Sequence, residues 1–164
     1  MNYHDILSEN DETLYDVYHG SPDPHIDQFR LHGLGHRTGT PGTLSFTTSI
    51  ATAKIYGAHI YRAHVAGNFG DYLVPDDVEK AFAWRWPSHR DSIGPRYAHD
   101  KRTAGLARAA ANLRTDIAKG HYALWENVAM WRDMGWDGAW CYESQSRNLI
   151  IGNIACILTI DKIT

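Results

Sequence analysis

Apolar residues recur along the chain at two spacings, one typical of strands and one typical of helices. Short aromatic and β-branched runs end at Gly, Pro, Asn or Ser, which predicts strands that stop in turns. The predicted strands cover 14–18, 44–47, 60–65, 139–142, 148–151 and 154–160. Ala-rich stretches and apolar residues three and four apart predict helices over 51–57, 76–84, 102–119 and 123–134. Strands at both ends with helices between them predict an α+β fold.

The length and composition suit one domain. With 164 residues, of which 43% are hydrophobic, the chain can bury a core of its own. Residues 1–12 are polar and acidic, so we expect them at the periphery. We therefore predict a single domain over 1–164, in which 76–134 form a mainly helical insert between two lobes of sheet.

Charge and cysteine usage exclude several classes of protein. The 16 Lys and Arg are outnumbered by 19 Asp and Glu, so the strong positive charge of a nonspecific nucleic-acid binder is missing. No apolar run approaches the ~18 residues that span a bilayer, and the first residues lack the pattern of a secretion signal. Cys141 and Cys156 lie in apolar runs, as buried thiols of a reducing compartment do. We expect a cytoplasmic protein that binds no membrane.

Common cofactor and metal motifs are missing from the sequence. There is no phosphate-binding loop and no nucleophile elbow, and Gly33-Leu34-Gly35 lacks the third glycine of a dinucleotide fingerprint. His32 and His36 are four residues apart but lie in a Gly-rich loop without a nearby carboxylate. We therefore predict no metal site.

Three short motifs follow one another in a fixed order. Tyr-His-Gly-Ser at 18–21 ends the first predicted strand, and Ser-Phe-Thr-Thr-Ser at 45–49 precedes a helix with Ala-x-x-Tyr at 53–56. Ser49 is the expected N-cap of that helix. Gly-Trp-Asp-Gly at 135–138 then leads into a strand that reaches Glu143. In this order the chain resembles the ADP-ribosyltransferase superfamily. It is most similar to small members from phages and mobile elements, including those of polyvalent proteins and anti-CRISPR proteins.

The resemblance implies split antiparallel sheets around an NAD cleft. It implies catalytic roles for Glu143, His19 and Tyr56, and NAD contacts for His19, Gly20, Ser21, Phe46, Thr47, Tyr56 and Asn148. His19 would bind a ribose hydroxyl, the Gly20 backbone would hold the nicotinamide amide, and Tyr56 would stack on the nicotinamide ring. Glu143 would stabilise the positive charge that develops on the ribose as its bond to nicotinamide breaks.

The chain departs from the family at one position. In many relatives the acid heads the strand after the turn, where Asn148 stands here, and an asparagine supplies no negative charge. Either Glu143 serves instead or catalysis is reduced. Simpler alternatives stay open for each residue: His19 bonded to backbone, Tyr56 packed in the core, and Glu143 solvated in a turn.

The function implied is transfer of ADP-ribose from NAD, as co-substrate, to a macromolecule. A phage effector would act on a host protein in the host cytoplasm. The alternatives are an NAD glycohydrolase, which uses water as the acceptor, and an inactive module that binds NAD or a protein. Basic residues gather over 85–108, which leaves a nucleic-acid acceptor or an acidic protein partner open, although a solvated helix face is the simpler explanation.

Overall fold

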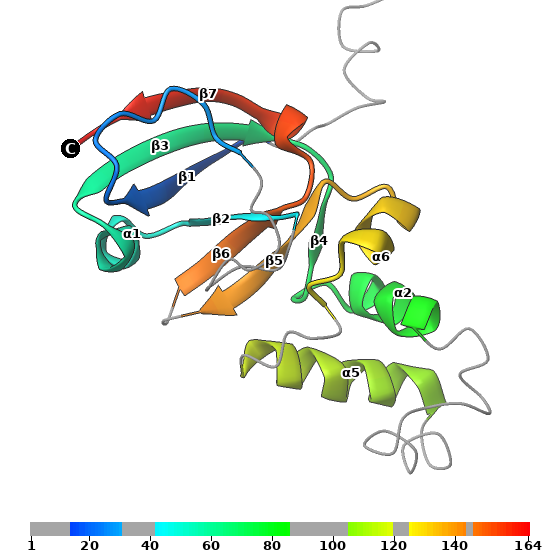
Figure 1. Cartoon of the computed structure of the whole chain (residues 1–164). Coiled ribbons are helices and arrows are strands. Elements are labelled where there is room, and N and C mark those ends of the chain that lie inside the picture. Colours follow the sequence, from blue (N-terminus) through cyan, green and yellow to red (C-terminus); the bar gives the residue numbers. More distant parts are fainter. Residues whose placement is uncertain (1–13, 31–41, 86–104, 120–124, 144–145) are drawn as a thin grey trace, which may run out of the picture.

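The computed structural model describes residues 14–30, 42–85, 105–119, 125–143 and 146–164 (Figure 1). Its elements in chain order are β1 (Leu14–Ser21), β2 (Leu44–Thr47), α1 (Ile50–Tyr56), β3 (His59–Ala66), β4 (Phe69–Asp71), α2 (Pro75–Arg85), α5 (Gly105–Ala118), α6 (Val128–Asp133), β5 (Gly138–Glu143), β6 (Ser146–Ile151), the 3-10 turn η1 (Ile154–Cys156) and β7 (Ile157–Lys162). The structure confirms a mixed α+β fold.

The seven strands form one hydrogen-bonded sheet in the order β4-β5-β6-β2-β1-β3-β7. Neighbouring strands are antiparallel except β4 and β5, which run parallel. A parallel pair requires a long crossover between its strands, and the helices α2, α5 and α6 lie in that crossover. The expected helical insert is thus the connection between two sheet strands, and α2 packs against α5 within it (Figure 1).

The sheet is folded on itself at the joint between β1 and β2. Among the described residues, this joint holds one registered pair, Tyr18 with Thr47, whereas β1 and β3 share eight. The rings of Tyr15 on β1 and Trp140 on β5 lie 5.1 Å apart, although β2 and β6 separate these strands in the sheet. A flat sheet would hold β1 and β5 about 14 Å apart, because neighbouring strands are spaced at roughly 4.8 Å.

Two half-sheets therefore face each other, one made of β1, β3 and β7 and the other of β2, β6, β5 and β4 (Figure 1). The resemblance implied split antiparallel sheets around a cleft. The structure instead shows one continuous folded sheet with one parallel pair, because β2 keeps its pairing to both β1 and β6.

Tryptophans fill much of the core on the β5 side. Trp125 and Trp131 are fully buried, and each satisfies its indole N–H on a backbone carbonyl. Trp125 Nε1 donates to Trp140 O at 2.8 Å, and Trp131 Nε1 donates to Trp125 O at 2.8 Å. A buried indole N–H without a partner would be costly, so these two bonds fix how the segment before α6 enters the core.

The sequence placed most elements correctly, but it missed one strand and several bounds differ. The strand expected over 14–18 continues to Ser21. The helix expected over 123–134 is wrong at 125–127, where Asn127 caps α6 by accepting a hydrogen bond from Met130 N. The strand expected over 154–160 begins instead as η1, because Asn153 accepts from Ala155 N. The three-residue strand β4 was not predicted at all.

Several sequence predictions concern single groups. Cys141 and Cys156 are buried thiols that form no disulfide, as predicted, and burial raises the pKa of Cys156 to about 12. His32, His36 and residues 1–12 lie outside the described residues. Within the described ranges, no cluster of three or more His, Cys, Asp or Glu could hold a metal. No helix found in these ranges is long and apolar enough to cross a membrane.

Candidate functional site

His19 lies where β1 runs on beyond its single registered pair with β2. Its Nδ1 is 3.0 Å from Ser45 O, across the gap between the two strands. A carbonyl oxygen only accepts, so Nδ1 carries the hydrogen in the neutral ring and Nε2 is left with its lone pair. Burial lowers the pKa of His19, and the bond to Ser45 opposes that shift. His19 is therefore a neutral hydrogen-bond acceptor at its outer nitrogen.

Aromatic rings fix the orientation of this imidazole. Phe29 and Phe46 meet it edge to face, with centroid separations of 5.1 and 5.8 Å. Phe46 is only 2% exposed, so it supports the His19 ring from within the core. The simpler alternative, a His19 bonded to backbone, is thus correct for Nδ1 and leaves Nε2 for a ligand.

Gly20 allows α1 to touch β1 backbone to backbone. A Cβ at Gly20 would lie 1.7 Å from Ala53 O, and a Cβ at Gly57 would lie 2.1 Å from Ser21 C. Only glycine at both positions permits this approach. The helix begins where it does because Ser49 Oγ accepts from Thr52 N, as predicted. This packing holds the C-terminal end of α1 beside the end of β1.

The contact between α1 and β1 determines the position of Tyr56, which is the last residue of α1. Its side chain is 41% exposed, whereas Ala53 on the same helix is fully buried. The alternative that packs Tyr56 in the core does not match this exposure. A partly exposed ring can stack on a flat ligand. Tyr56 is not among the residues that line the cavity beside His19.

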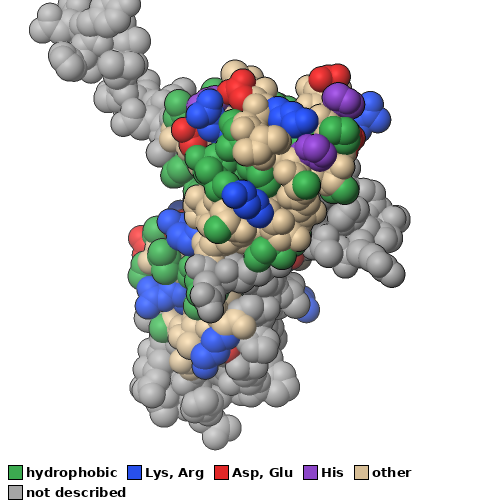
Figure 2. Space-filling model, turned by 90° about the vertical axis from the view of Figure 1, so that its left-hand side faces the viewer, with side chains coloured by type: hydrophobic (Ala, Val, Ile, Leu, Met, Phe, Trp, Pro, Cys, Tyr) green, Lys and Arg blue, Asp and Glu red, His purple; other side chains and the backbone are tan. Residues whose placement is uncertain are grey.

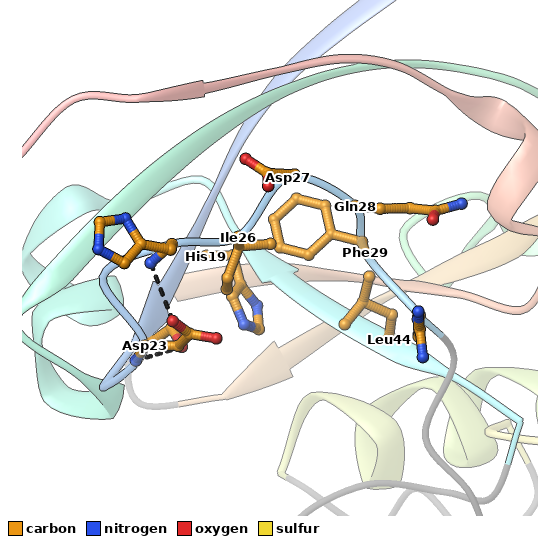
Figure 3. Close-up of a pocket in the computed structure, with 10 residues that line it drawn as sticks. His19, Asp23, Ile26, Asp27, Gln28, Phe29 and Leu44 are labelled. Atoms are coloured by element: carbon orange, nitrogen blue, oxygen red, sulfur yellow. Dashed lines mark hydrogen bonds between the residues drawn. The ribbon is translucent and has the colours of Figure 1, made fainter.

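A cavity of about 570 Å³ opens beside His19 (Figure 3). Its apolar lining comes from Ile26, Phe29 and Leu44. Its polar lining consists of His19, Ser21, Asp23, His25, Asp27, Gln28 and Arg30. Pockets that hold small ligands have volumes of about 300–1,000 Å³ and combine an apolar base with a few polar groups. The cavity is large enough to hold a nucleoside.

The loop that forms this cavity is anchored to the sheet. Tyr61, the β3 partner of His19, donates its hydroxyl to Asp23 O at 2.8 Å and accepts from Ile26 N at 3.2 Å. Asp23 N donates to Ser21 Oγ at 3.0 Å, and His25 N donates to Asp23 Oδ1 at 2.8 Å. None of the loop residues after Ser21 was predicted as a site residue, although Ser-Pro-Asp-Pro at 21–24 is a strong turn signal.

A second polar group lies at the other end of β2. Thr47 Oγ1 lies 3.0 Å from Ser146 Oγ, which donates to Asn148 Oδ1 at 3.1 Å. Thr47 and Asn148 are paired across β2 and β6, and each is 3% exposed. The backbone of Glu143 ends β5 directly opposite Ser146, and its side chain lies outside what the structure describes.

The predicted site residues thus fall into two neighbouring groups. His19, Ser21 and the supporting Phe46 belong to the cavity, whereas Thr47 and Asn148 do not line it. Successive side chains of a strand point to opposite faces, and Thr47 pairs with Tyr18, the neighbour of His19. The two groups therefore lie on opposite faces of the sheet, at the joint where β1 and β2 share a single registered pair. No local pattern in the sequence indicates this division.

Comparisons with known proteins give little beyond this geometry. No protein-family model matches the sequence, and no curated protein matches it. One solved structure, the crystal structure of an anti-CRISPR protein, is similar at 15% sequence identity with a TM-score of 0.47. The alignment covers 92% of this chain and 96% of that one. Similarity at this level does not show a common activity.

Proposed function

We propose that this protein is an NAD-dependent ADP-ribosyltransferase that modifies a macromolecule, with a host protein as the acceptor. The observation that carries the proposal is the end of β1. There a neutral His19, its Nδ1 held by Ser45 O, lies on the wall of a cavity of about 570 Å³. Gly20 follows it at a backbone-to-backbone contact with α1, the helix that carries Tyr56.

The proposed reaction breaks the bond between nicotinamide and ribose. Nicotinamide leaves with the bonding electron pair, and positive charge develops on the ribose carbon. His19 Nε2 would accept a hydrogen bond from a ribose hydroxyl, and Tyr56 would hold the nicotinamide ring by stacking. Glu143, whose backbone lies opposite Ser146 in the second polar group, would have to reach round the end of β5 to supply the negative charge that stabilises the cation. The acceptor nucleophile then bonds to the ribose carbon and gives up its proton to a base.

A protein acceptor suits the surface better than nucleic acid does. On the face shown in Figure 2, Lys and Arg side chains are scattered among acidic and neutral groups, so the described residues there form no continuous basic patch. Phosphate backbones are bound by clustered cations. Most of the basic residues of 85–108 lie outside the described residues.

The direct test incubates the protein with NAD labelled in the adenylate part and with cell extract, and also measures nicotinamide release. We expect a labelled macromolecule with the wild type and loss of labelling with Glu143→Gln. Glu79→Gln, on the distant helix α2, is the matched control and should label normally. If the wild type neither transfers label nor releases nicotinamide, the proposal is wrong. Free ADP-ribose with no labelled macromolecule would indicate an NAD glycohydrolase instead.

One observation favours a second candidate, a catalytically inactive module that binds NAD or a protein. Asn148, where many relatives carry the acid, is neutral and buried, and its Oδ1 is held by Ser146. Calorimetry distinguishes the two. Binding of NAD without turnover, unchanged in Glu143→Gln, would support the inactive module.

A further inference from the structure

Asp23 and Asp27 are the carboxylates among the described residues that line the cavity beside His19. The proposed reaction places a positive charge on the ribose that His19 binds. The backbone of Glu143 lies instead opposite Ser146, in the second polar group. On the basis of the proposed function, we infer that Asp23 is a further catalytic residue, whose carboxylate lies against the reacting ribose and stabilises its positive charge.

Tyr61 links the position of Asp23 to that of His19. It is the β3 partner of His19 in the sheet, and its hydroxyl donates to Asp23 O at 2.8 Å. The imidazole of His19 is fixed in turn by the bond between its Nδ1 and Ser45 O. The turn that carries Asp23 is therefore tied to the strand pair that positions His19, and both side chains line one cavity (Figure 3).

The carboxylate of Asp23 is oriented by its own turn. Its Oδ1 accepts from His25 N at 2.8 Å, and its backbone N–H donates to Ser21 Oγ at 3.0 Å. Within the described ranges no residue bonds to its second oxygen, Oδ2. A charged group that is already oriented needs no rearrangement when charge develops beside it, which makes it effective in the transition state.

Asp27 carries the same charge on the same loop but lacks this support. It makes no hydrogen bond or ion pair to any residue that the structure describes, and neither does Arg30, the lining residue with a permanent positive charge. All three charged side chains are exposed, so water screens them until a bound ligand displaces it. Because Asp27 is not held in one orientation, it is the natural comparison for Asp23.

The step to which Asp23 contributes moves no proton. The bond between the ribose carbon and the nicotinamide nitrogen breaks, and its electron pair moves to the nitrogen. The positive charge of the nicotinamide ring thereby passes to the ribose. Asp23 stays ionised throughout, so its effect is electrostatic and is stronger in the transition state than in bound NAD. An interaction of this kind raises kcat and has little effect on KM.

The experiment measures nicotinamide release by the full chain over a range of NAD concentrations. Asp27→Asn removes one charge from the same cavity and is the matched control. Asp23→Asn should have a kcat at least about tenfold below that of Asp27→Asn, with little change in KM. Asparagine keeps an oxygen that can accept from His25 N, so the turn is preserved. Asp23→Ser, which also keeps a side-chain oxygen, repeats the test with a second neutral residue.

The possible failures are distinguishable. If wild type releases nicotinamide and both Asp23 variants have a kcat less than about tenfold below that of Asp27→Asn, the inference is overturned and the proposed function stands. A higher KM with unchanged kcat would also overturn the inference, because Asp23 would then act on bound NAD alone. No nicotinamide release by wild type would overturn the proposed function, and the inference with it.

Discussion

Replacing Gly20 by alanine tests the contact on which the geometry of the site depends. A Cβ at this position would lie 1.7 Å from Ala53 O and 2.7 Å from Ala53 C. Side-chain carbons are essentially never found closer than 3.0 Å to such atoms, so α1 and β1 must separate by at least 3.0 − 1.7 = 1.3 Å. The obstacle is backbone on both sides, and no rotamer change can relieve it.

Overpacking of a tight contact costs about 1–3 kcal/mol, and a backbone clash of this size belongs at the upper end. For a domain of this length, about 3 kcal/mol lowers the Tm by roughly 6–12 °C. Urea unfolding followed by tryptophan fluorescence measures the change. Gly152→Ala is the control, because the atoms nearest to its Cβ would be side-chain atoms and not backbone: the Trp131 ring at 3.1 Å and Val128 Cγ1 at 3.7 Å. It should cost less than about 1 kcal/mol. A Gly20→Ala protein as stable as Gly152→Ala would refute the backbone contact between α1 and β1.

Three further predictions concern single side chains. Burial lowers the pKa of His19, so the folded protein resists protonation of this ring. As the pH falls below 6.5, wild type should therefore lose unfolding free energy relative to His19→Asn, whereas above that pH the difference between the two proteins should not change with pH. The test is urea unfolding of both proteins between about pH 5 and 8. A difference in unfolding free energy that stays constant over this range would contradict the prediction. Tyr61→Phe removes the hydroxyl that binds Asp23 O and Ile26 N and should cost about 1–3 kcal/mol, measured by urea unfolding, with weaker NAD binding as the cavity loop loosens. Neither Cys141 nor Cys156 should react with iodoacetamide at pH 8 until the protein is unfolded, and mass spectrometry showing rapid native labelling would disprove their burial.

Local signals in the sequence were enough to place much of the fold. β2 has the predicted bounds, Leu44–Thr47, because its apolar run is bounded by turn residues on both sides. Ser49 was predicted as the cap of α1 because a side-chain oxygen at that point satisfies a free backbone N–H. His19, Gly20 and Ser21 were correctly placed at the end of the first strand.

Features that depend on tertiary contacts were beyond such signals. The three residues of β4 are too few to show a period, and they form a strand because β5 lies beside them. The segment before α6 contains helix-forming residues, but Trp125 leaves the helix to bury its indole and donate to Trp140 O. The division of the site residues between two faces follows from the register of Tyr18 with Thr47, which no local pattern reveals.

The order of strands also determines how the protein acquires its structure. Each half-sheet combines early and late parts of the chain, since β7 completes the half begun by β1 and β6 completes the half begun by β2. Thr47 and Ser146, which are hydrogen-bonded, are 99 residues apart. High contact order of this kind slows folding, because the entropy of closing long loops is lost before the contacts form. Neither half can be completed before β6 and β7 have been synthesised, so the two halves should form together in one cooperative transition.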